Sequence, residues 1–530
     1  MKTNDPARIV IPSAQRAPRD LSSSSLFALP LAIPGEAFLK RRDLIKLGGA
    51  SLLWTAGARL LSAQQAPMPM PAQASPQNSA SGQAHESTPA DFTLRIAPIA
   101  LEIAPSRFIS TIGYNGTSPG PVLRMREGKP VSVDVVNETD TSELVHWHGF
   151  FVPPEVDGTD EEGTPPVPPG GRRRYQFIPR PAGTRWYHSH AMAGADLHRG
   201  TYTGQYGFVL IDSGDDPGHY DQEIFLAIRD WEPFFTDQME NEAAEGGNLG
   251  PQPEKPATLD TRPNGLEVTS QLFSINDKAL GTGEPIRVKA GQRCLFHIVN
   301  ASAIENRTIA LPGHRFQVIA TDGNKVPTPQ SVEVLMIGPG ERIDALVEMN
   351  QPGVWILGST DDMTRNAGLG VIVEYENAHR QPQWVPPSKP LWDYTVFGRS
   401  SSAAPPAPDH TIDMVFEKIP SGAGQFNLWQ VNGKPYPHDR EFVLQEGARY
   451  RLVFRNRTDD SHPVHLHRHL FELLDVNGKP TAGILKDTVI VPLYGRVSVD
   501  LVANQPGLSL FHCHIQQHMD FGFKALFRYA

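Results

Sequence analysis

Three copies of one short pattern set the strongest limit on how this chain can fold. The copies read EGKPVSVDVVN, AGQRCLFHIVN and EGARYRLVFRN, and they end at Asn137, Asn300 and Asn456. Each has a Gly before a run of strand-forming residues and an Asn at its end, and successive copies are separated by roughly one domain length. We therefore expect three consecutive copies of one β module.

Composition agrees with a mostly β protein. The chain of 530 residues has 49 Pro and 46 Gly, and its apolar runs are short, β-branched and followed by turn residues. A chain of this length is expected to form two to four domains. No apolar run is long enough to cross a bilayer, so stable membrane insertion is not expected.

Charge is unevenly distributed along the chain. Residues 1–63 carry nine Lys or Arg and four Asp or Glu, a net charge of +5, which leaves −15 for the remainder because the whole chain has −10. Such an acidic body argues against nucleic acid as a partner.

The basic N-terminal region resembles a twin-arginine export signal. Arg41 and Arg42 precede the short apolar segment of KRRDLIKLGGASLLWTAGARLLSA, and Ala63 is a suitable cleavage point. We predict a signal region at 1–63, transient contact with the twin-arginine export machinery, and a periplasmic or extracellular location. The alternative is an amphipathic N-terminal helix. Residues 64–90 are rich in Pro, Ala, Ser and Gln and are predicted to be a disordered linker.

Histidine pairs occur at matching places in the first and third copies. Nine and eleven residues after each repeated Asn, the three copies carry His146 and His148, Ile309 and Leu311, and His465 and His467. Five and seven residues after a second shared landmark, a Gly, they carry His188 and His190, Gly358 and Thr360, and His512 and His514. Residues i and i+2 of a strand share one face, roughly 6.5 to 7 Å apart, which suits two imidazoles that reach neighbouring metals. A single pair is most often structural, but four at equivalent positions predict a multinuclear metal site across a module interface.

A cysteine lies between the last two histidines, and the chain has only two cysteines. If His512 and His514 face the cluster, Cys513 faces the opposite side of the same strand. His462 and His518 are the histidines left over nearby, and two imidazoles with one thiolate form the ligand set of a blue-copper electron-transfer site. The alternatives are a small buried hydrophobe and a structural zinc site, which needs fewer ligands than this chain offers.

At these motifs the chain resembles a known family. HWHG, YHSH, HPVHLH and HCHIQQH are similar to the four copper signatures of the three-domain multicopper oxidases, which include laccases, ascorbate oxidases and bacterial cuprous oxidases. The resemblance covers about residues 91–530. It implies an all-β fold of three consecutive cupredoxin-like Greek-key β-barrel or sandwich domains. These are 91–212 with trinuclear copper ligands, 220–376 without copper, and 392–530 with the type 1 copper and further trinuclear ligands.

The same resemblance implies four copper ions and gives each its ligands. The type 1 copper receives His462, Cys513 and His518, and the type 2 copper receives His146 and His465. The type 3 pair receives His148, His188, His190, His467, His512 and His514.

The implied reaction couples one-electron oxidation of a small-molecule reductant at the type 1 copper to four-electron reduction of O₂ to water at the trinuclear cluster. Electrons would pass from Cys513 to His512 and His514. Asp157 matches a family carboxylate that relays protons near the type 2 copper, so these four residues are the predicted catalytic ones. The alternative for Asp157 is an ordinary turn residue before a Gly.

Two positions depart from common family patterns. Met519 follows His518 where some bacterial members carry an acidic residue, so part of the proton path is expected from elsewhere, with Asp520 as a candidate. Phe523 stands where many relatives place an axial Met. Because Phe cannot coordinate copper, we predict a high type 1 potential, and a core-filling role is compatible with it.

The donor is the least determined part of the prediction. We expect a laccase-like oxidase of phenols or aromatic amines, and the alternative is a periplasmic metal oxidase that acts on Cu(I) or another reduced ion. Cuprous oxidases resemble one another in a Met-rich segment, whereas Met336, Met349, Met363 and Met414 are well separated here. A third possibility, a copper-storing or scaffold protein, is disfavoured by the complete ligand set.

Overall fold

The computed structural model of the chain describes residues 89–530 except 215–217, 237–263, 389–391, 400–404 and 439–440. The predicted signal region and nearly all of the predicted linker therefore lie outside the described residues. In the described part, no helix has both the length and the apolar character needed to cross a membrane.

The first third of the described chain forms two four-stranded sheets that enclose one apolar core. Their strand orders are β2-β1-β4-β6 and β3-β8-β7-β5. Strand β3 shows how the sequence defines the two faces, since Leu123 and Met125 are buried while Arg124 and Arg126 between and after them are exposed. The elements are β1 (Phe92–Ala104), β2 (Arg107–Tyr114), β3 (Leu123–Arg126), β4 (Val131–Asn137), β5 (Val145–His148), α1 (Pro154–Asp157), β6 (Arg172–Phe177), β7 (Gly183–Ser189), η1 (Gly200–Tyr202) and β8 (Tyr206–Asp212).

The second sandwich has a six-stranded sheet of order β10-β9-β12-β17-β14-β15 and a five-stranded sheet of order β11-β19-β18-β13-β16. Its elements are β9 (Gln222–Thr236), β10 (Glu267–Ile275), β11 (Ile286–Val288), β12 (Arg293–Asn300), β13 (Arg307–Ala310), β14 (Phe316–Thr321), β15 (Asn324–Val332), β16 (Val334–Ile337), β17 (Arg342–Glu348), β18 (Val354–Ser359), α2 (Asp362–Asn366) and β19 (Gly370–Tyr375).

The third sandwich repeats this arrangement with the orders β21-β20-β23-β28-β25-β26 and β22-β30-β29-β24-β27. Its elements are η2 (Tyr394–Phe397), β20 (His410–Ile419), β21 (Leu428–Val431), β22 (Glu441–Leu444), β23 (Arg449–Asn456), β24 (His462–Leu466), β25 (Phe471–Val476), β26 (Lys479–Lys486), β27 (Thr488–Val491), β28 (Arg496–Val502), β29 (Ser509–Cys513), α3 (Gln516–Asp520) and β30 (Lys524–Tyr529).

The three repeated segments occupy equivalent strands, which are β4, β12 and β23. Each pairs in parallel with the first strand of its sandwich and antiparallel with β6, β17 or β28. The all-β fold predicted from the repeat is therefore confirmed, while the domain limits given above stay a prediction.

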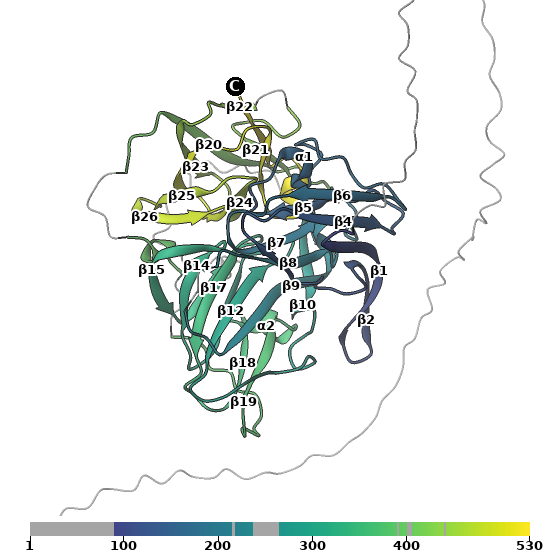
Figure 1. Cartoon of the computed structure of the whole chain (residues 1–530), viewed down its shortest axis with the longest axis vertical. Coiled ribbons are helices and arrows are strands. Elements are labelled where there is room, and N and C mark those ends of the chain that lie inside the picture. The colour runs from purple at the N-terminus through teal and green to yellow at the C-terminus, as the bar shows by residue number, and fades with distance from the viewer. Residues whose placement is uncertain (1–88, 215–217, 237–263, 389–391, 400–404, 439–440) are drawn as a thin grey trace, which may run out of the picture. The chain divides into compact units, whose positions relative to one another are not determined.

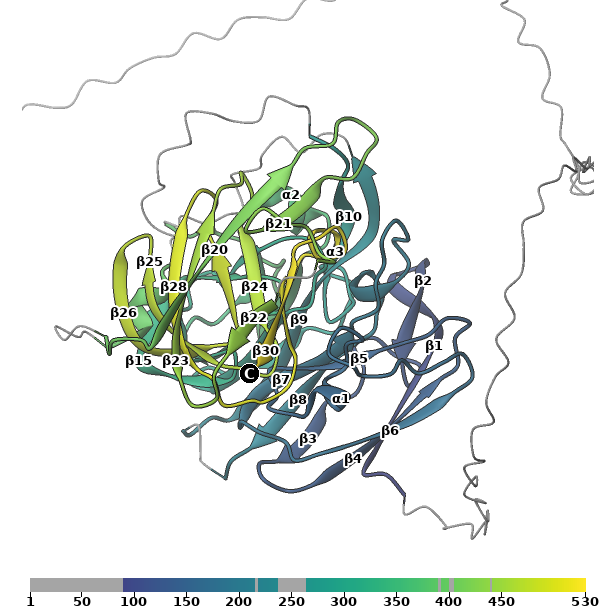
Figure 2. The same cartoon turned by 90° about the horizontal axis from the view of Figure 1, so that it is seen from above.

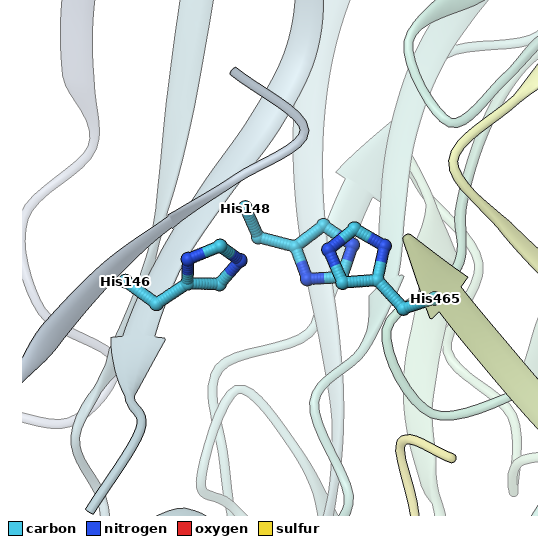
Figure 3. A group of neighbouring side chains, drawn as sticks. All are labelled: His146, His148 and His465. Carbon is cyan, nitrogen blue, oxygen red and sulfur yellow. The ribbon is translucent and has the colours of Figure 1, made fainter. Parts of the chain in front are cut away.

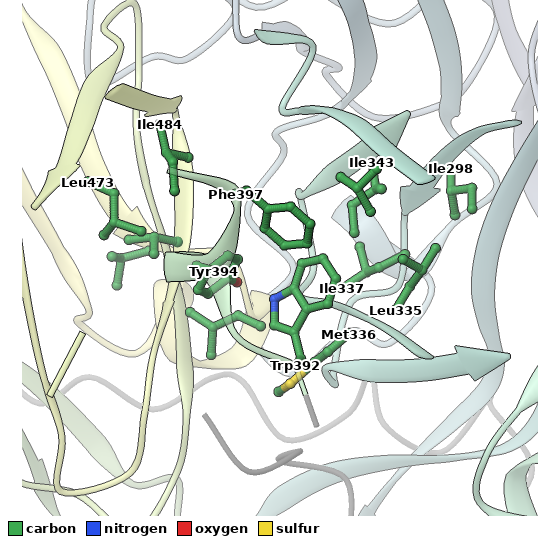
Figure 4. Close-up of a cluster of buried hydrophobic side chains, with 14 of the residues drawn as sticks. Ile298, Leu335, Met336, Ile337, Ile343, Trp392, Tyr394, Phe397, Leu473 and Ile484 are labelled. Carbon is green, nitrogen blue, oxygen red and sulfur yellow. The ribbon is translucent and has the colours of Figure 1, made fainter. Parts of the chain in front are cut away.

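A shared apolar core joins the second and third sandwiches. Figure 4 shows Trp392, Tyr394 and Phe397 of the connecting segment between Ile337 of the second sandwich and Ile484 of the third. All five side chains are buried, and burying each contributes about 1.5 to 3 kcal/mol. This core fixes the third sandwich against the second. Cys294 lies in the same core.

Strands of the first and third sandwiches meet at the functional site. In Figure 1, β5 of the first sandwich lies near β24 of the third, and rings carried by these two strands stack on each other; Figure 2 shows the same sandwiches from above. Strand β17 of the second sandwich contacts β7 as well. All three sandwiches thus approach one region, and the histidine pairs lie on, or directly after, β5, β7, β24 and β29.

Candidate metal centre

Antiparallel pairing brings the histidines of each sandwich together. In the first sandwich, β5 and β7 place His146 opposite His188, with ring centroids 5.3 Å apart. In the third sandwich, β24 and β29 place His465 opposite His512, with centroids 5.7 Å apart. Because side chains alternate along a strand, the second histidine of each pair projects from the same face.

The two groups of rings meet across the interface between the sandwiches. The rings of His148 and His465 stack with centroids 3.7 Å apart and an angle of 13° between their planes (Figure 3). The rings of His146 and His467 stack similarly at 3.9 Å. The convergence expected from the four histidine pairs is present in the structure, and all eight side chains are buried.

The eight rings form three groups whose nitrogens could each hold one metal ion. In each group the ligand atoms lie within 4.8 Å of one another. The groups are His146, His148 and His465; His148, His188 and His514; and His190, His467 and His512.

Several inward nitrogens have no hydrogen-bond partner in the structure. They are Nε2 of His146, His188 and His465, and Nδ1 of His148, and each is buried. In addition, Nε2 of His467 and Nε2 of His512 face each other at 3.0 Å. Buried polar atoms without partners are rare because each costs free energy, so their concentration at one place indicates an absent ligand. Imidazole nitrogens are suitable ligands for copper.

Burial keeps these imidazoles neutral and able to donate a lone pair to a metal. It lowers the pKa of His148, His188, His465 and His514 well below 6.5, and it lowers the pKa of His512 to about 3. The neighbouring rings add to the effect, since two charged imidazolium groups would repel each other. The site therefore favours a metal cation over protons across the neutral pH range.

Backbone carbonyl groups fix the orientation of four of the eight rings. Nδ1 of His146 donates to the carbonyl of Asp157 at 2.9 Å, and Nδ1 of His465 donates to that of Asp487 at 2.9 Å. Nδ1 of His188 donates to the carbonyl of Ser189 at 2.9 Å. With the proton on Nδ1, the lone pair of Nε2 points into the centre.

Asp157 lies at the end of α1 and is fully buried beside the cluster. Its Oδ2 is 2.8 Å from Nδ1 of His467 and 3.1 Å from Nδ1 of His146. The carboxyl group therefore bridges rings from both sandwiches, which an ordinary turn residue would not do. Glu162, which the sequence reasoning missed, lies 3.4 Å from the same His467 nitrogen through its Oε1. Burial, and then the charge of Asp157, raises the pKa of Glu162.

The second centre lies on the opposite side of β29. Sγ of Cys513 is 3.7 Å from Nδ1 of His462 and 3.6 Å from Nδ1 of His518, and all three side chains are buried. The predicted orientation of Cys513, away from its two neighbours, is thus present. Burial raises the pKa of the thiol, and a bound cation would favour the thiolate.

Aromatic rings enclose this second centre. Trp429 packs on His518 with ring centroids 3.8 Å apart, and Phe523 contacts His462 at 4.9 Å. Phe523 is fully buried, so it fills the core beside His462, one of the residues of this centre. The two roles suggested for Phe523 are compatible in the structure.

The second sandwich also reaches this centre. Oε2 of Glu267, at the start of β10, is 3.9 Å from Nε2 of His518. Burial, and then the nearby charge of Asp460, raises the pKa of Glu267 to about 8. Nothing in the local sequence marks Glu267, because its neighbour is 251 positions away along the chain.

Asp520, which the sequence suggested in place of the acidic residue absent at Met519, hydrogen-bonds to the first sandwich. Its Oδ2 accepts hydrogen bonds from the backbone N–H groups of Ala193 and Gly194, at 2.9 and 2.8 Å. It also accepts from the amide of Gln516. Asp520 therefore holds the loop that follows His190.

Comparisons with known proteins agree with the fold and the site. The chain matches the multicopper oxidase family in three segments, residues 100–216, 223–377 and 410–530. Multicopper oxidase MmcO of Mycobacterium tuberculosis is 31% identical over 444 residues, which cover 80% of this chain and 84% of that protein.

Two solved structures are similar in fold. Fet3p, described as a multicopper oxidase that functions in iron import, superposes with a TM-score of 0.66 at 19% identity, covering 83% of this chain and 90% of that one. The laccase of Botrytis aclada superposes with a TM-score of 0.65 at 20% identity, covering 82% and 87%.

The chain therefore belongs to the multicopper oxidase family, with its three-domain cupredoxin-like fold. Members of this family are copper-dependent oxidoreductases that use O₂ and a reductant. The similar proteins include a laccase and an iron-import oxidase, so membership leaves the donor open.

Proposed function

We propose that the protein is a laccase-like multicopper oxidase that couples one-electron oxidation of phenolic or aromatic donors to reduction of O₂ to water. In this proposal His462, Cys513 and His518 hold the type 1 copper, and His146 and His465 hold the type 2 copper. One type 3 copper has the ligands His148, His188 and His514, and the other has His190, His467 and His512. These sets correspond to the groups of neighbouring ligand atoms described above.

The connection between the two centres carries this proposal. Cys513 faces one centre, while His512 and His514, its neighbours in the chain, face the other. Two metal sites joined by so few covalent bonds serve electron transfer better than storage. Bound copper would supply one-electron chemistry at the first centre and O₂ reduction at the second.

The protein's own carboxyl groups would bring protons to the cluster. Asp157 bridges Nδ1 of His467 and Nδ1 of His146, so a proton held on its carboxyl group lies next to both rings. Glu162 stands beside it on the same side of His467. We assign these two carboxyl groups to the path that brings protons to the oxygen being reduced.

The preference for an organic donor rests on the methionines. Met336, Met349 and Met414 are fully buried in apolar cores, and Met363 is exposed on α2 of the second sandwich. Three of these four side chains are therefore enclosed in cores, and the four are scattered over the second and third sandwiches and do not form a Met-rich segment. Met519 is buried directly after His518 and is a single thioether.

One observation favours the alternative, a metal oxidase. The carboxyl group of Glu267 lies 3.9 Å from the outer nitrogen of His518, and a carboxylate at this place could hold a reduced metal cation during electron transfer. The raised pKa of Glu267 works against this role, because a protonated carboxyl group binds cations weakly.

Oxygen uptake by the copper-loaded protein distinguishes the two donors. Rapid uptake with a diphenol and only background uptake with Cu(I) is the expected result. The reverse result would replace the laccase-like proposal with a copper-detoxifying metal oxidase. Cys513→Ser is the control, since it removes the thiolate and should stop uptake with either donor.

We assign the protein to the periplasm or the exterior, with export through the twin-arginine machinery. This proposal rests on Arg41 and Arg42 before a short apolar segment. Replacing both arginines with Lys should leave the protein in the cytoplasmic fraction. Unchanged export of the variant would contradict it.

A further inference from the structure

The second sandwich has none of the proposed copper ligands, yet it touches the cluster directly. The turn between β16 and β17 passes beside His514. A Cβ added at Gly340 would lie 2.6 Å from Cδ2 of that ring, and Gly340 has a φ of +87°. The backbone of this turn therefore forms part of the wall of the cluster.

Arg342 follows this turn at the start of β17 and is completely buried. Its Nη1 donates to Oδ1 of Asp487 at 2.7 Å, and its Nη2 donates to Oδ2 at 2.6 Å. Further hydrogen bonds to the carbonyls of Gly340 and Asp322, at 3.0 and 3.1 Å, fix the guanidinium plane. Such a two-point contact sets the orientation of a carboxylate as well as its position.

Asp487 in turn contacts two rings of the cluster. Its Oδ1 is 3.1 Å from Nε2 of His148, and its backbone carbonyl accepts from Nδ1 of His465 at 2.9 Å. Thr488 contributes a hydroxyl 3.1 Å from the same nitrogen of His148. One short segment of the third sandwich thus holds one ring of the first sandwich and one ring of its own sandwich.

The ring of His148 is turned the opposite way from the other cluster rings that hydrogen-bond to a carbonyl or carboxyl group. In His146, His188, His465, His467 and His512 the held nitrogen is Nδ1. In His148 the held nitrogen is Nε2, and Nδ1 is the buried atom without a partner. The backbone does not impose this reversed orientation by a carbonyl contact, so the side chains of Asp487 and Thr488 select it.

We infer that Arg342 is a positioning residue of the copper cluster: by holding both oxygens of Asp487, it keeps His148 turned with Nδ1 toward the metals. The inference rests on the proposed function, since it assumes that His148 is a copper ligand. It gives the copper-free second domain a defined part in assembling the cluster.

The packing around these groups is tight. A Cβ at Gly149, the residue after His148, would lie 2.7 Å from both Nη2 of Arg342 and Oδ2 of Asp487, so only Gly fits there. Arg185 is 3.7 Å from Asp487, too far for a hydrogen bond, so Arg342 is the arginine that makes the two-point contact.

The test compares two buried arginines of the second sandwich in the copper-loaded full chain. Arg342→Gln removes the contact with Asp487. Arg229→Gln is the matched control, because Arg229 is equally buried and binds carbonyls of Thr201, Thr203 and Ala301 but contacts none of the proposed ligands. Three quantities are measured: blue absorption per chain, the fraction of copper visible by electron paramagnetic resonance, and the chelator concentration that removes copper from the cluster.

We expect Arg342→Gln to keep its blue absorption, because Cys513 lies in a separate centre. Loss of a ligand-orienting contact should weaken cluster copper by about 10- to 100-fold, seen as removal at a correspondingly lower chelator concentration. The visible fraction of copper should rise, since a disturbed pair loses the magnetic coupling that hides its signal. Arg229→Gln should match the wild type in all three quantities.

Arg342→Lys keeps the charge but cannot hold both oxygens in one plane, so we expect the same changes at smaller size. It takes the place of Arg342→Gln if that variant does not fold. If the folded Arg342 variant has the same visible copper fraction as the wild type and loses cluster copper at the same chelator concentration, the inference about Arg342 is wrong and the proposed function is unaffected. A wild-type protein that takes up no copper would overturn the proposed function as well.

Discussion

A histidine of the second sandwich makes the stability of the protein depend on pH in a predictable direction. Nδ1 of His297 is 2.8 Å from Oδ1 of Asp344, and its Nε2 is 3.2 Å from Oε1 of Glu223. Thr184 of the first sandwich donates to the same Asp344, so the group joins two sandwiches. Burial opposes protonation, but Asp344 and Glu223 outweigh it and raise the pKa of His297 from 6.5 to about 9.

The sign follows from the two pKa values. Because the folded-state pKa is higher than the unfolded-state pKa, the stabilisation is fully present below about pH 6.5 and is lost as the pH rises through about 9. A shift of about 2.5 units at about 1.4 kcal/mol per unit corresponds to about 3 kcal/mol. For about 440 folded residues, with an unfolding entropy of about 2.1 cal/mol/K per residue, this is a change in Tm of about 3 to 4 °C.

The assay is scanning calorimetry of the wild type and His297→Gln between pH 6 and 10. The difference in Tm should be largest at pH 6 and should shrink by about 3 to 4 °C by pH 10. His314→Gln is the control, since burial lowers the pKa of His314 and its contribution to stability is lost only as the pH falls below about 6.5. A difference in Tm for His297→Gln that is constant over this range would refute the reasoning.

Three further predictions concern the two centres. Asp157→Asn should slow O₂ reduction by about 100-fold or more while the blue absorption stays, and equal turnover at every pH would exclude a proton-relay role. Phe523→Met should lower the type 1 potential in a redox titration, because an added axial thioether donor stabilises Cu(II) relative to Cu(I). A potential that does not fall would contradict the tuning role. Gly340→Ala should cost about 1 to 3 kcal/mol of stability, since the residue has a positive φ and its new methyl group would meet His514. Gly128→Ala, with a φ of +73° and open space, should cost less, and equal losses would show that the contact is unimportant.

Much of the site could be predicted because its geometry repeats. The three similar segments predicted equivalent strands, and β4, β12 and β23 are equivalent in sheet order and pairing. The alternation of side chains along a strand predicted that His512 and Cys513 face opposite sides, and their contacts do so. Such predictions succeed because they depend only on strand periodicity, which is a local property of the backbone.

The partners of the ligands could not be predicted in this way. Asp487 lies 339 positions from His148, and Arg342 lies 145 positions from Asp487. Glu162 stands in a run of acidic residues in which nothing marks one member as buried. Each owes its role to the way the sandwiches dock, and docking depends on the packing of large apolar surfaces such as the core around Trp392.

The sequence by itself determined the class of fold, the histidine and cysteine positions, and the separation of two centres on opposite faces of one strand. These follow from the spacing of residues along single strands. Only the tertiary structure decided which rings lie close enough to share one metal ion, which nitrogen of His148 lacks a protein partner, and that the domain without ligands contacts His148 through Arg342 and Asp487. Those features depend on distances between strands far apart in the chain, which side-chain packing sets and residue spacing does not.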